Sequence, residues 1–173
     1  MEFVSALKER IPDYAKDIRL NLDAVIGRSS LDQADALGAA LAAAYAARSK
    51  TIVDAIRGSG ELSEVDLNGA LSAAALMGMN NVWYPYVEMA ADDELRTQRA
   101  ELRMNAYATH GGIDKNRFEL FSLAASIVGK CHFCVRSHYK LLKEAGMTAQ
   151  QLRDVGRIAA VVTAAANALA IEG

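Results

Sequence analysis

Hydrophobic positions along this chain recur at the spacing of amphipathic helices rather than that of strands. In the Ala- and Leu-rich segment 31–48, Leu37, Leu41 and Tyr45 lie four residues apart and therefore share one helix face. No alternating apolar and polar run bounded by hairpin turns occurs anywhere in the sequence. The pattern predicts an all-α protein of about seven or eight helices.

Capping residues and glycines mark where these helices begin and end. Ser63 and Asp114 stand as N-cap residues before apolar stretches, and Thr148 opens a capping box. Gly146 predicts the end of a helix that begins near Cys131. No linker-like segment interrupts the series, so we expect a single domain.

Two segments of the chain resemble each other and suggest an internal duplication. Residues 71–83 align without gaps on residues 122–134, with Gly78 opposite Gly129. Each copy predicts a helix, a glycine break and a second helix, although chance similarity between two Ala-rich helices is the alternative. The pseudo-repeats are expected around residues 63–90 and 114–146.

Composition and charge narrow the class of protein. With 173 residues, of which 52% are hydrophobic, the chain can build one core over residues 1–173. A net charge of −2 provides no basic field for nucleic acid. The N-terminus lacks the features of a secretion signal, and the strongly apolar run 158–171 is too short for a bilayer. We therefore expect a cytoplasmic protein with neither a nucleic-acid nor a membrane partner.

The reactive side chains are concentrated in one short segment. Both cysteines and two of the three histidines lie between Cys131 and His138. On a helix, Cys131, Cys134 and His138 share one face. The helix start favours a thiolate at Cys131, whereas His138 lies one turn beyond Cys134 and can accept its proton. Without a secretion signal, a Cys-x-x-Cys pair indicates redox or metal chemistry.

Glu119 is a candidate partner for the His138 imidazole. If the chain folds back at Gly129, Glu119 and His138 lie about 15 Å and about 12 Å from the turn, at roughly 1.5 Å per residue. The carboxylate would then orient the imidazole, directly or through a water. A solvated surface charge is the alternative for Glu119.

The spacing Glu119, Cys131-x-x-Cys134 and His138 resembles the active-site pattern of the AhpD family of alkyl hydroperoxidases, in the carboxymuconolactone decarboxylase superfamily. The resemblance extends over nearly the whole chain. It includes segments 12–22, 77–82, 102–105 and 118–120.

This resemblance implies a fold, a reaction and partners. The family consists of all-helical homotrimers built on a duplicated unit, which reduce organic peroxides and the active-site disulfide of a partner peroxiredoxin, AhpC. Electrons come from dihydrolipoamide on the lipoylated acyltransferase of a 2-oxoacid dehydrogenase, and no cofactor or metal is bound. The absence of a phosphate-binding glycine fingerprint agrees with electron delivery by thiol–disulfide exchange.

The resemblance also implies a role for each candidate residue. Cys134 attacks the peroxide, passing through a sulfenic acid, or forms a mixed disulfide with a partner. Cys131 then resolves it as a Cys131–Cys134 disulfide, while Glu119 and His138 relay protons. Family members often carry His directly before the second cysteine, where this chain has Phe133. The histidine one position earlier, His132, is therefore assigned no catalytic role.

Other interpretations of the same residues stay open. Cys131, Cys134 and His138, with or without Glu119, offer a Zn²⁺ ligand set, although no second pair closes a structural site. A decarboxylase or lactone enzyme of the same superfamily would give the paired thiols no evident task. A non-catalytic helical interaction module is a third alternative.

Aromatic and methionine side chains elsewhere are expected to serve packing. Residues 77–86 contain Met77, Met79, Trp83, Tyr84 and Tyr86 and are expected to form core or subunit interface. Tyr139 and Phe121 lie close to the motif in sequence and are candidates to line a substrate pocket.

Overall fold

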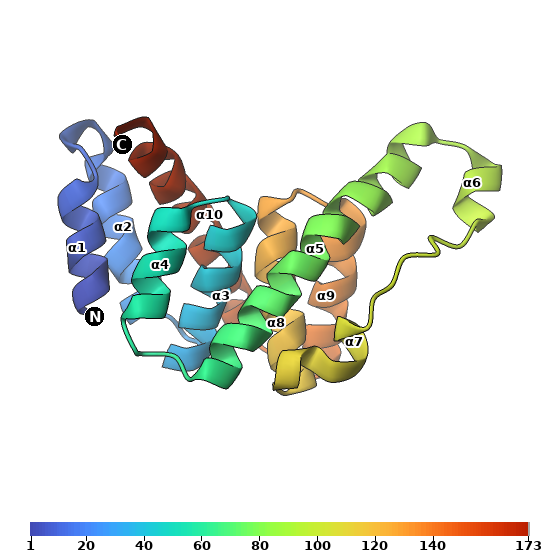
Figure 1. Ribbon diagram of the computed structural model, residues 1–173, viewed down its shortest axis with the longest axis horizontal. Coiled ribbons are helices and arrows are strands. Elements are labelled where there is room, and N and C mark those ends of the chain that lie inside the picture. The colour runs from blue at the N-terminus through green and yellow to red at the C-terminus, as the bar shows by residue number, and fades with distance from the viewer. Residues whose placement is uncertain (173) are drawn as a thin grey trace.

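The computed structural model describes residues 1–172, and these form a bundle of helices without a strand (Figure 1). The helices are α1 Glu2–Arg10, α2 Lys16–Gly27, α3 Gln33–Ala46, α4 Lys50–Gly58, α5 Glu64–Ala90, α6 Asp93–Thr97, α7 Ala106–Thr109, α8 Lys115–Val128, α9 His132–Glu144 and α10 Ala149–Glu172. Short 3₁₀ turns occupy Asp13–Ala15 and His110–Gly112. The all-α prediction is confirmed. The ten α-helices of the described residues exceed the seven or eight expected, because α6 and α7 have only five and four residues and are too short for a periodic pattern.

The predicted capping residues begin the helices that surround the site. The Ser63 hydroxyl and the Asp114 carboxylate each accept a hydrogen bond from a backbone N–H in the first turn of α5 and α8. The Thr148 hydroxyl accepts from the N–H of Gln151, whose side chain accepts from the N–H of Thr148. Gly146, with φ +94°, follows the end of α9. The sequence therefore places the starts of α5, α8 and α10 correctly.

Helix α3 lies at the centre of the bundle and packs against α5, α8 and α10. Its buried stretch 36–44 is mostly alanine, which lets neighbouring backbones approach closely. At Gly38 an added Cβ would lie 2.2 Å from the ring of Phe121 on α8. This close approach fixes how α8 lies on α3, and α8 carries Glu119.

Arg117 ties three of these helices together. Its Nε donates to Oδ1 of Asp35 on α3 at 2.7 Å, and its Nη1 pairs with Asp66 on α5. Arg117 lies on α8, two residues before Glu119. The ion pairs therefore help to set the register of α8 against α3 and α5.

Helix α5 runs unbroken across Gly78, where the sequence predicted a break. A Cβ at Gly78 would meet nothing within 4 Å, so glycine makes neither a turn nor a close contact there. By contrast, α8 and α9 separate at Gly129 and Lys130. The predicted break at Gly78 is wrong, and the internal duplication stays a prediction.

An arm projects away from the bundle, and it consists of the C-terminal half of α5, the whole of α6 and the connection 98–105 (Figure 1). This projecting arm leaves the apolar side chains of Val82, Tyr86 and Met89 exposed. Exposed apolar side chains gathered on one element are typical of a surface that another protein covers.

Helix α10 is, by length and composition, long and apolar enough to cross a membrane, longer than the run 158–171 suggests. Core helices of soluble proteins meet the same criterion, so this is weak evidence for a membrane span. The helix packs against α2, α3 and α8 and buries Val155, Ile158 and Val162 among them. These contacts are those of a core helix.

Candidate active site

Cys131 and Cys134 form a disulfide bond at the N-terminus of α9. Cys131 is the N-cap residue, and its Sγ accepts a hydrogen bond from the backbone N–H of Cys134 at 3.2 Å. The two residues are 0% and 3% exposed. The structure therefore represents the oxidised state of the pair, with the sulfur of Cys131 held against the start of a helix.

The turn that presents the cysteines depends on Gly129. An added Cβ at Gly129 would lie 2.1 Å from the side-chain nitrogen of Asn81, which donates to the carbonyl oxygen of Ala125 at the end of α8. The next residue, Lys130, adopts φ +55° and reverses the chain. As a result α9 folds back along α8, and this brings His138 on α9 beside Glu119 on α8.

Glu119 and His138 meet directly across the two helices. Oε2 of Glu119 lies 2.6 Å from Nδ1 of His138, and the residues are only 4% and 3% exposed. From the sequence, Glu119 is either a partner of the imidazole or a solvated surface charge. The structure shows it as a buried partner of the imidazole. A carboxylate acceptor at Nδ1 fixes the orientation of the ring and directs Nε2 toward α5.

Helix α5 supplies a third wall of the site, which the sequence did not indicate. Sδ of the fully buried Met77 lies 3.2 Å from Nε2 of His138. The carbonyl oxygen of Asn80 lies 3.8 Å from Sγ of Cys134, a position from which it can accept a hydrogen bond from the reduced thiol. The side-chain Oδ1 of Asn80 is buried without a hydrogen-bond partner.

Tyr107 on α7 is a further polar group close to Glu119 of the Glu119–His138 pair. Burial, together with the nearby Glu119 and Tyr84, raises the pKa of the Tyr107 hydroxyl to about 12, although a hydrogen bond with Asn80 opposes the shift. The Tyr107 ring packs edge-on against Phe118, with centroids 5.9 Å apart. The hydroxyl therefore keeps its proton at any physiological pH.

A groove of about 440 Å³ opens beside the Cys-x-x-Cys segment. Phe133 lies in its lining and stacks on Tyr84, with ring centroids 4.3 Å apart. The remaining lining residues are Trp83, Val87, Glu88, Leu95, Arg96, Gln98 and Arg136. The expectation that Phe121 and Tyr139 line a substrate pocket is wrong for this groove, because Phe121 is fully buried and Tyr139 is not part of the lining.

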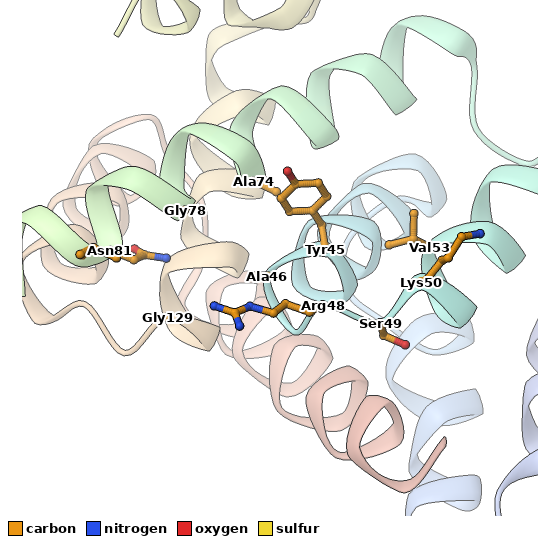
Figure 2. Close-up of a pocket in the computed structure, with 11 residues that line it drawn as sticks. Tyr45, Ala46, Arg48, Ser49, Lys50, Val53, Ala74, Gly78, Asn81 and Gly129 are labelled. Carbon is orange, nitrogen blue, oxygen red and sulfur yellow. The ribbon is translucent and has the colours of Figure 1, made fainter. Parts of the chain in front are cut away.

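A second pocket, of about 590 Å³, lies behind the α8–α9 turn (Figure 2). Tyr45 and Arg48 border it on one side, and Asn81 and Gly129 border it on the other. Neither cysteine lines this pocket. It touches the back of the turn rather than the reactive groups.

His132 stands apart from the buried groups. Its side chain is 70% exposed, and Nδ1 lies 3.6 Å from Oε1 of Glu88 on α5. Within residues 1–172 no cluster of three or more side chains has the arrangement of a metal site. The two sulfur atoms that the zinc interpretation requires are bonded to each other.

Sequence comparison finds close relatives over almost the full length. The chain is 43% identical to the alkyl hydroperoxide reductase AhpD of Rhodospirillum centenum, over 98% of this chain and 91% of that protein. It is 42% identical to the AhpD protein of Maricaulis maris, over 98% of each chain. It is 40% identical to that of Coxiella burnetii, over 95% of this chain and 96% of the relative.

The chain belongs to the AhpD family. The wider carboxymuconolactone decarboxylase family matches residues 93–172, which run from α6 to α10. The matched residues include both cysteines, His138 and Glu119, whereas Met77 and Asn80 come from the part that precedes them.

Proposed function

We propose that the protein is a thiol-dependent alkyl hydroperoxidase in which Cys131 and Cys134 cycle between dithiol and disulfide. The observation that carries this proposal is the Cys131–Cys134 disulfide on the same helix as His138, which is paired with the buried Glu119. The similarity to relatives named alkyl hydroperoxide reductase AhpD supports the choice of peroxide as the substrate.

Cys134 is the proposed nucleophile of the oxidative half-reaction. Its thiolate attacks the outer oxygen of the hydroperoxide, the O–O bond breaks, and the alkoxide takes a proton from His138 and leaves as the alcohol. Cys134 is then a sulfenic acid. The Cys131 thiol attacks that sulfur, water leaves and the disulfide forms. Glu119 accepts a hydrogen bond from Nδ1–H of His138 and thereby orients the ring during both proton transfers.

A dithiol restores the reduced enzyme. A donor thiolate attacks Sγ of Cys134, the disulfide breaks and its electron pair passes to Cys131. The N–H of Cys134 and the start of α9 stabilise the Cys131 thiolate. The second donor thiolate then breaks the mixed disulfide, becomes part of the oxidised donor and releases Cys134.

Dihydrolipoamide, carried by the acyltransferase of a 2-oxoacid dehydrogenase, is the proposed electron donor. A peroxiredoxin of the AhpC type is the proposed protein partner, whose disulfide would be reduced by the same thiol exchange. Membership of the AhpD family supports both assignments.

The groove lined by Trp83 and Phe133 is the proposed site for the alkyl part of the peroxide. Phe133 and Arg136 of the Cys131–His138 segment line it, although neither cysteine does, and five of its nine lining residues are aromatic or apolar. Such a lining favours an alkyl chain over water.

The proposed assembly is a cytoplasmic homotrimer of one domain over residues 1–173, with pseudo-repeats at 63–90 and 114–146. The projecting arm supports an assembly, because Val82, Tyr86 and Met89 lack cover within the chain. The duplicated unit is supported by the ungapped alignment of the two segments.

A peroxidase assay with matched cysteine variants tests the proposal. Purified protein should consume cumene hydroperoxide with dihydrolipoamide as the reductant, and faster than with thioredoxin. Cys134→Ser should abolish turnover, whereas His132→Gln, a change at an exposed side chain, should leave it unchanged. Undiminished turnover by Cys134→Ser would refute the assignment.

A further inference from the structure

The contact between Met77 and His138 specifies which atom of the imidazole carries hydrogen in the oxidised protein. Nε2 of His138 lies 3.2 Å from Sδ of Met77, within hydrogen-bonding reach for sulfur. A thioether has lone pairs but no hydrogen, so it can only accept. The contact is favourable only when Nε2 carries the proton, because an unprotonated Nε2 would turn its own lone pair toward the lone pairs of sulfur.

The other ring nitrogen also belongs to a hydrogen-bonded pair. Nδ1 lies 2.6 Å from Oε2 of Glu119, the distance of a charge-assisted hydrogen bond. With hydrogen at Nε2 and a shared proton at Nδ1, the Glu119–His138 pair has no net charge. All three side chains are buried, with Met77 at 0%, His138 at 3% and Glu119 at 4% exposure. A neutral pair avoids burying a single uncompensated charge.

We propose that Met77 is a positioning residue that holds the Nε2 proton of His138 while the disulfide is closed, for delivery to Cys134 when the disulfide is reduced. This inference rests on the proposed function. When the second donor thiolate breaks the mixed disulfide, the sulfur–sulfur electron pair passes to Cys134. The Cys134 thiolate takes the Nε2 proton, and His138 recovers a proton from solvent only after the next oxidation has closed the disulfide again.

The role of Met77 differs between the two half-reactions. During reduction the imidazole must already carry the proton, and the thioether favours that state. During oxidation the proton that His138 donates to the alkoxide comes from the Cys134 thiol itself. Removal of the sulfur acceptor should therefore slow reduction far more than oxidation.

Met77→Leu, with Met79→Leu as its matched control, tests the proposal. Leucine keeps the apolar volume but cannot accept a hydrogen bond. Met79 lies on the same helix, is partly buried and packs on the core. Reduction of the oxidised protein by dithiothreitol is followed by thiol alkylation and mass spectrometry, and oxidation of the reduced protein by cumene hydroperoxide is followed in the same way.

In Met77→Leu we expect the rate of disulfide reduction to fall about tenfold, while the rate of oxidation changes less than about twofold. The tenfold loss is a part of the whole rate contribution that a general acid makes. Met79→Leu should change neither rate. Equal slowing of both half-reactions in Met77→Leu would overturn the proposal, since it would indicate general damage to the site. The same loss in Met79→Leu would also overturn it.

A spectroscopic measurement provides a readout that does not depend on activity. In oxidised protein labelled with ¹⁵N-histidine, the His138 ring, assigned by comparison with His138→Gln, should show hydrogen on both nitrogens at pH 7. Met77→Leu should lose the Nε2 signal, and Met79→Leu should keep it. An Nε2 signal that persists in Met77→Leu would refute the role of Met77. Failure of the wild-type protein to consume peroxide would instead refute the proposed function and leave this comparison intact.

Discussion

Nδ1 of His138 and Oε2 of Glu119 lie 2.6 Å apart across the interface of α8 and α9, with both side chains buried. The two residues reach this contact because the chain reverses at Gly129 and Lys130. Since each group is the other's partner in a site shielded from water, removal of either leaves a buried polar group unpaired. Even a conservative substitution of Glu119 or His138 should therefore disturb the contact.

Replacement of Glu119 by glutamine should reduce peroxide turnover with little change in fold. The amide keeps the size of the side chain but loses the charge that orients and supports the imidazole. Loss of this orientation should lower kcat by about 10- to 100-fold, within the contribution of general acid–base catalysis. Steady-state peroxide assays measure the effect, and circular dichroism checks the fold. A kcat within twofold of the wild type would contradict the role of Glu119.

Replacement of Cys131 by serine should trap the first oxidation product on Cys134. Without the resolving thiol, the sulfenic acid persists and reacts with dimedone. Mass spectrometry after one equivalent of peroxide should locate the adduct on Cys134. In the matched variant Cys134→Ser no adduct is expected, and an adduct on Cys131 there would reverse the order of attack.

Replacement of Trp83 by alanine should weaken the binding of bulky peroxides selectively. Trp83 lines the groove beside Phe133, and its loss removes apolar contact with an alkyl group. An apolar contact of this size is worth about 10-fold in discrimination. KM for cumene hydroperoxide should rise by about that factor, while turnover of hydrogen peroxide stays the same. An equal effect on both substrates would show that the groove does not hold the alkyl group.

Asp154 should stabilise the fold at neutral pH and lose that effect in acid. Burial opposes ionisation of its carboxylate, but hydrogen bonds from Ser30, Arg157 and Arg153 outweigh burial and hold the pKa below the usual range. A lowered pKa in the folded state stabilises the fold above the unfolded value of about 4, and the contribution is lost as pH falls below it. Asp154→Asn should lower the free energy of unfolding by about 2 kcal/mol at pH 7.

Urea denaturation of wild type and Asp154→Asn at several pH values measures this dependence. The difference in the free energy of unfolding should be constant from pH 7 to about pH 5 and should narrow below about pH 4. A difference that does not change with pH would show that Asp154 acts through packing alone. A matched variant, Asp93→Asn, changes an exposed carboxylate and should have little effect at any pH.

Replacement of Gly129 by alanine should disturb the turn before Cys131. The new Cβ would lie 2.1 Å from the side-chain nitrogen of Asn81 and would displace the amide that binds Ala125. Overpacking of this kind lowers the free energy of unfolding by about 1–3 kcal/mol. Gly78→Ala, where a Cβ meets nothing, is the matched control and should not destabilise the protein. Thermal denaturation of both variants tests the difference.

The sequence predicts those parts of the site that lie within one helix or across one short turn. The shared face of Cys131, Cys134 and His138 follows from helix periodicity. Counting residues on either side of Gly129 makes Glu119 a candidate partner of His138, with a solvated surface charge as the alternative. Met77 is not predicted as a partner, because its place beside His138 depends on how α5 packs against α9. No spacing rule relates residues that far apart in the chain.

The predicted break at Gly78 fails for a related reason. A single glycine weakens a helix by about 1 kcal/mol relative to alanine, and tertiary packing readily offsets that loss. The capped start of α5 and its contacts with α3 and α8 hold the helix across this position. At Gly129, by contrast, the helix does end, because the adjoining Lys130 adopts a positive φ. No local propensity of lysine specifies that conformation.

The burial of both sulfur atoms limits which cellular thiols can exchange with them. With 0% and 3% exposure, Cys131 and Cys134 are shielded from a freely diffusing tripeptide such as glutathione. A slender dithiol on a flexible tether can reach such sulfurs with less displacement of the surrounding side chains. Steric access, in addition to reduction potential, would then insulate this redox pair from the general thiol pool.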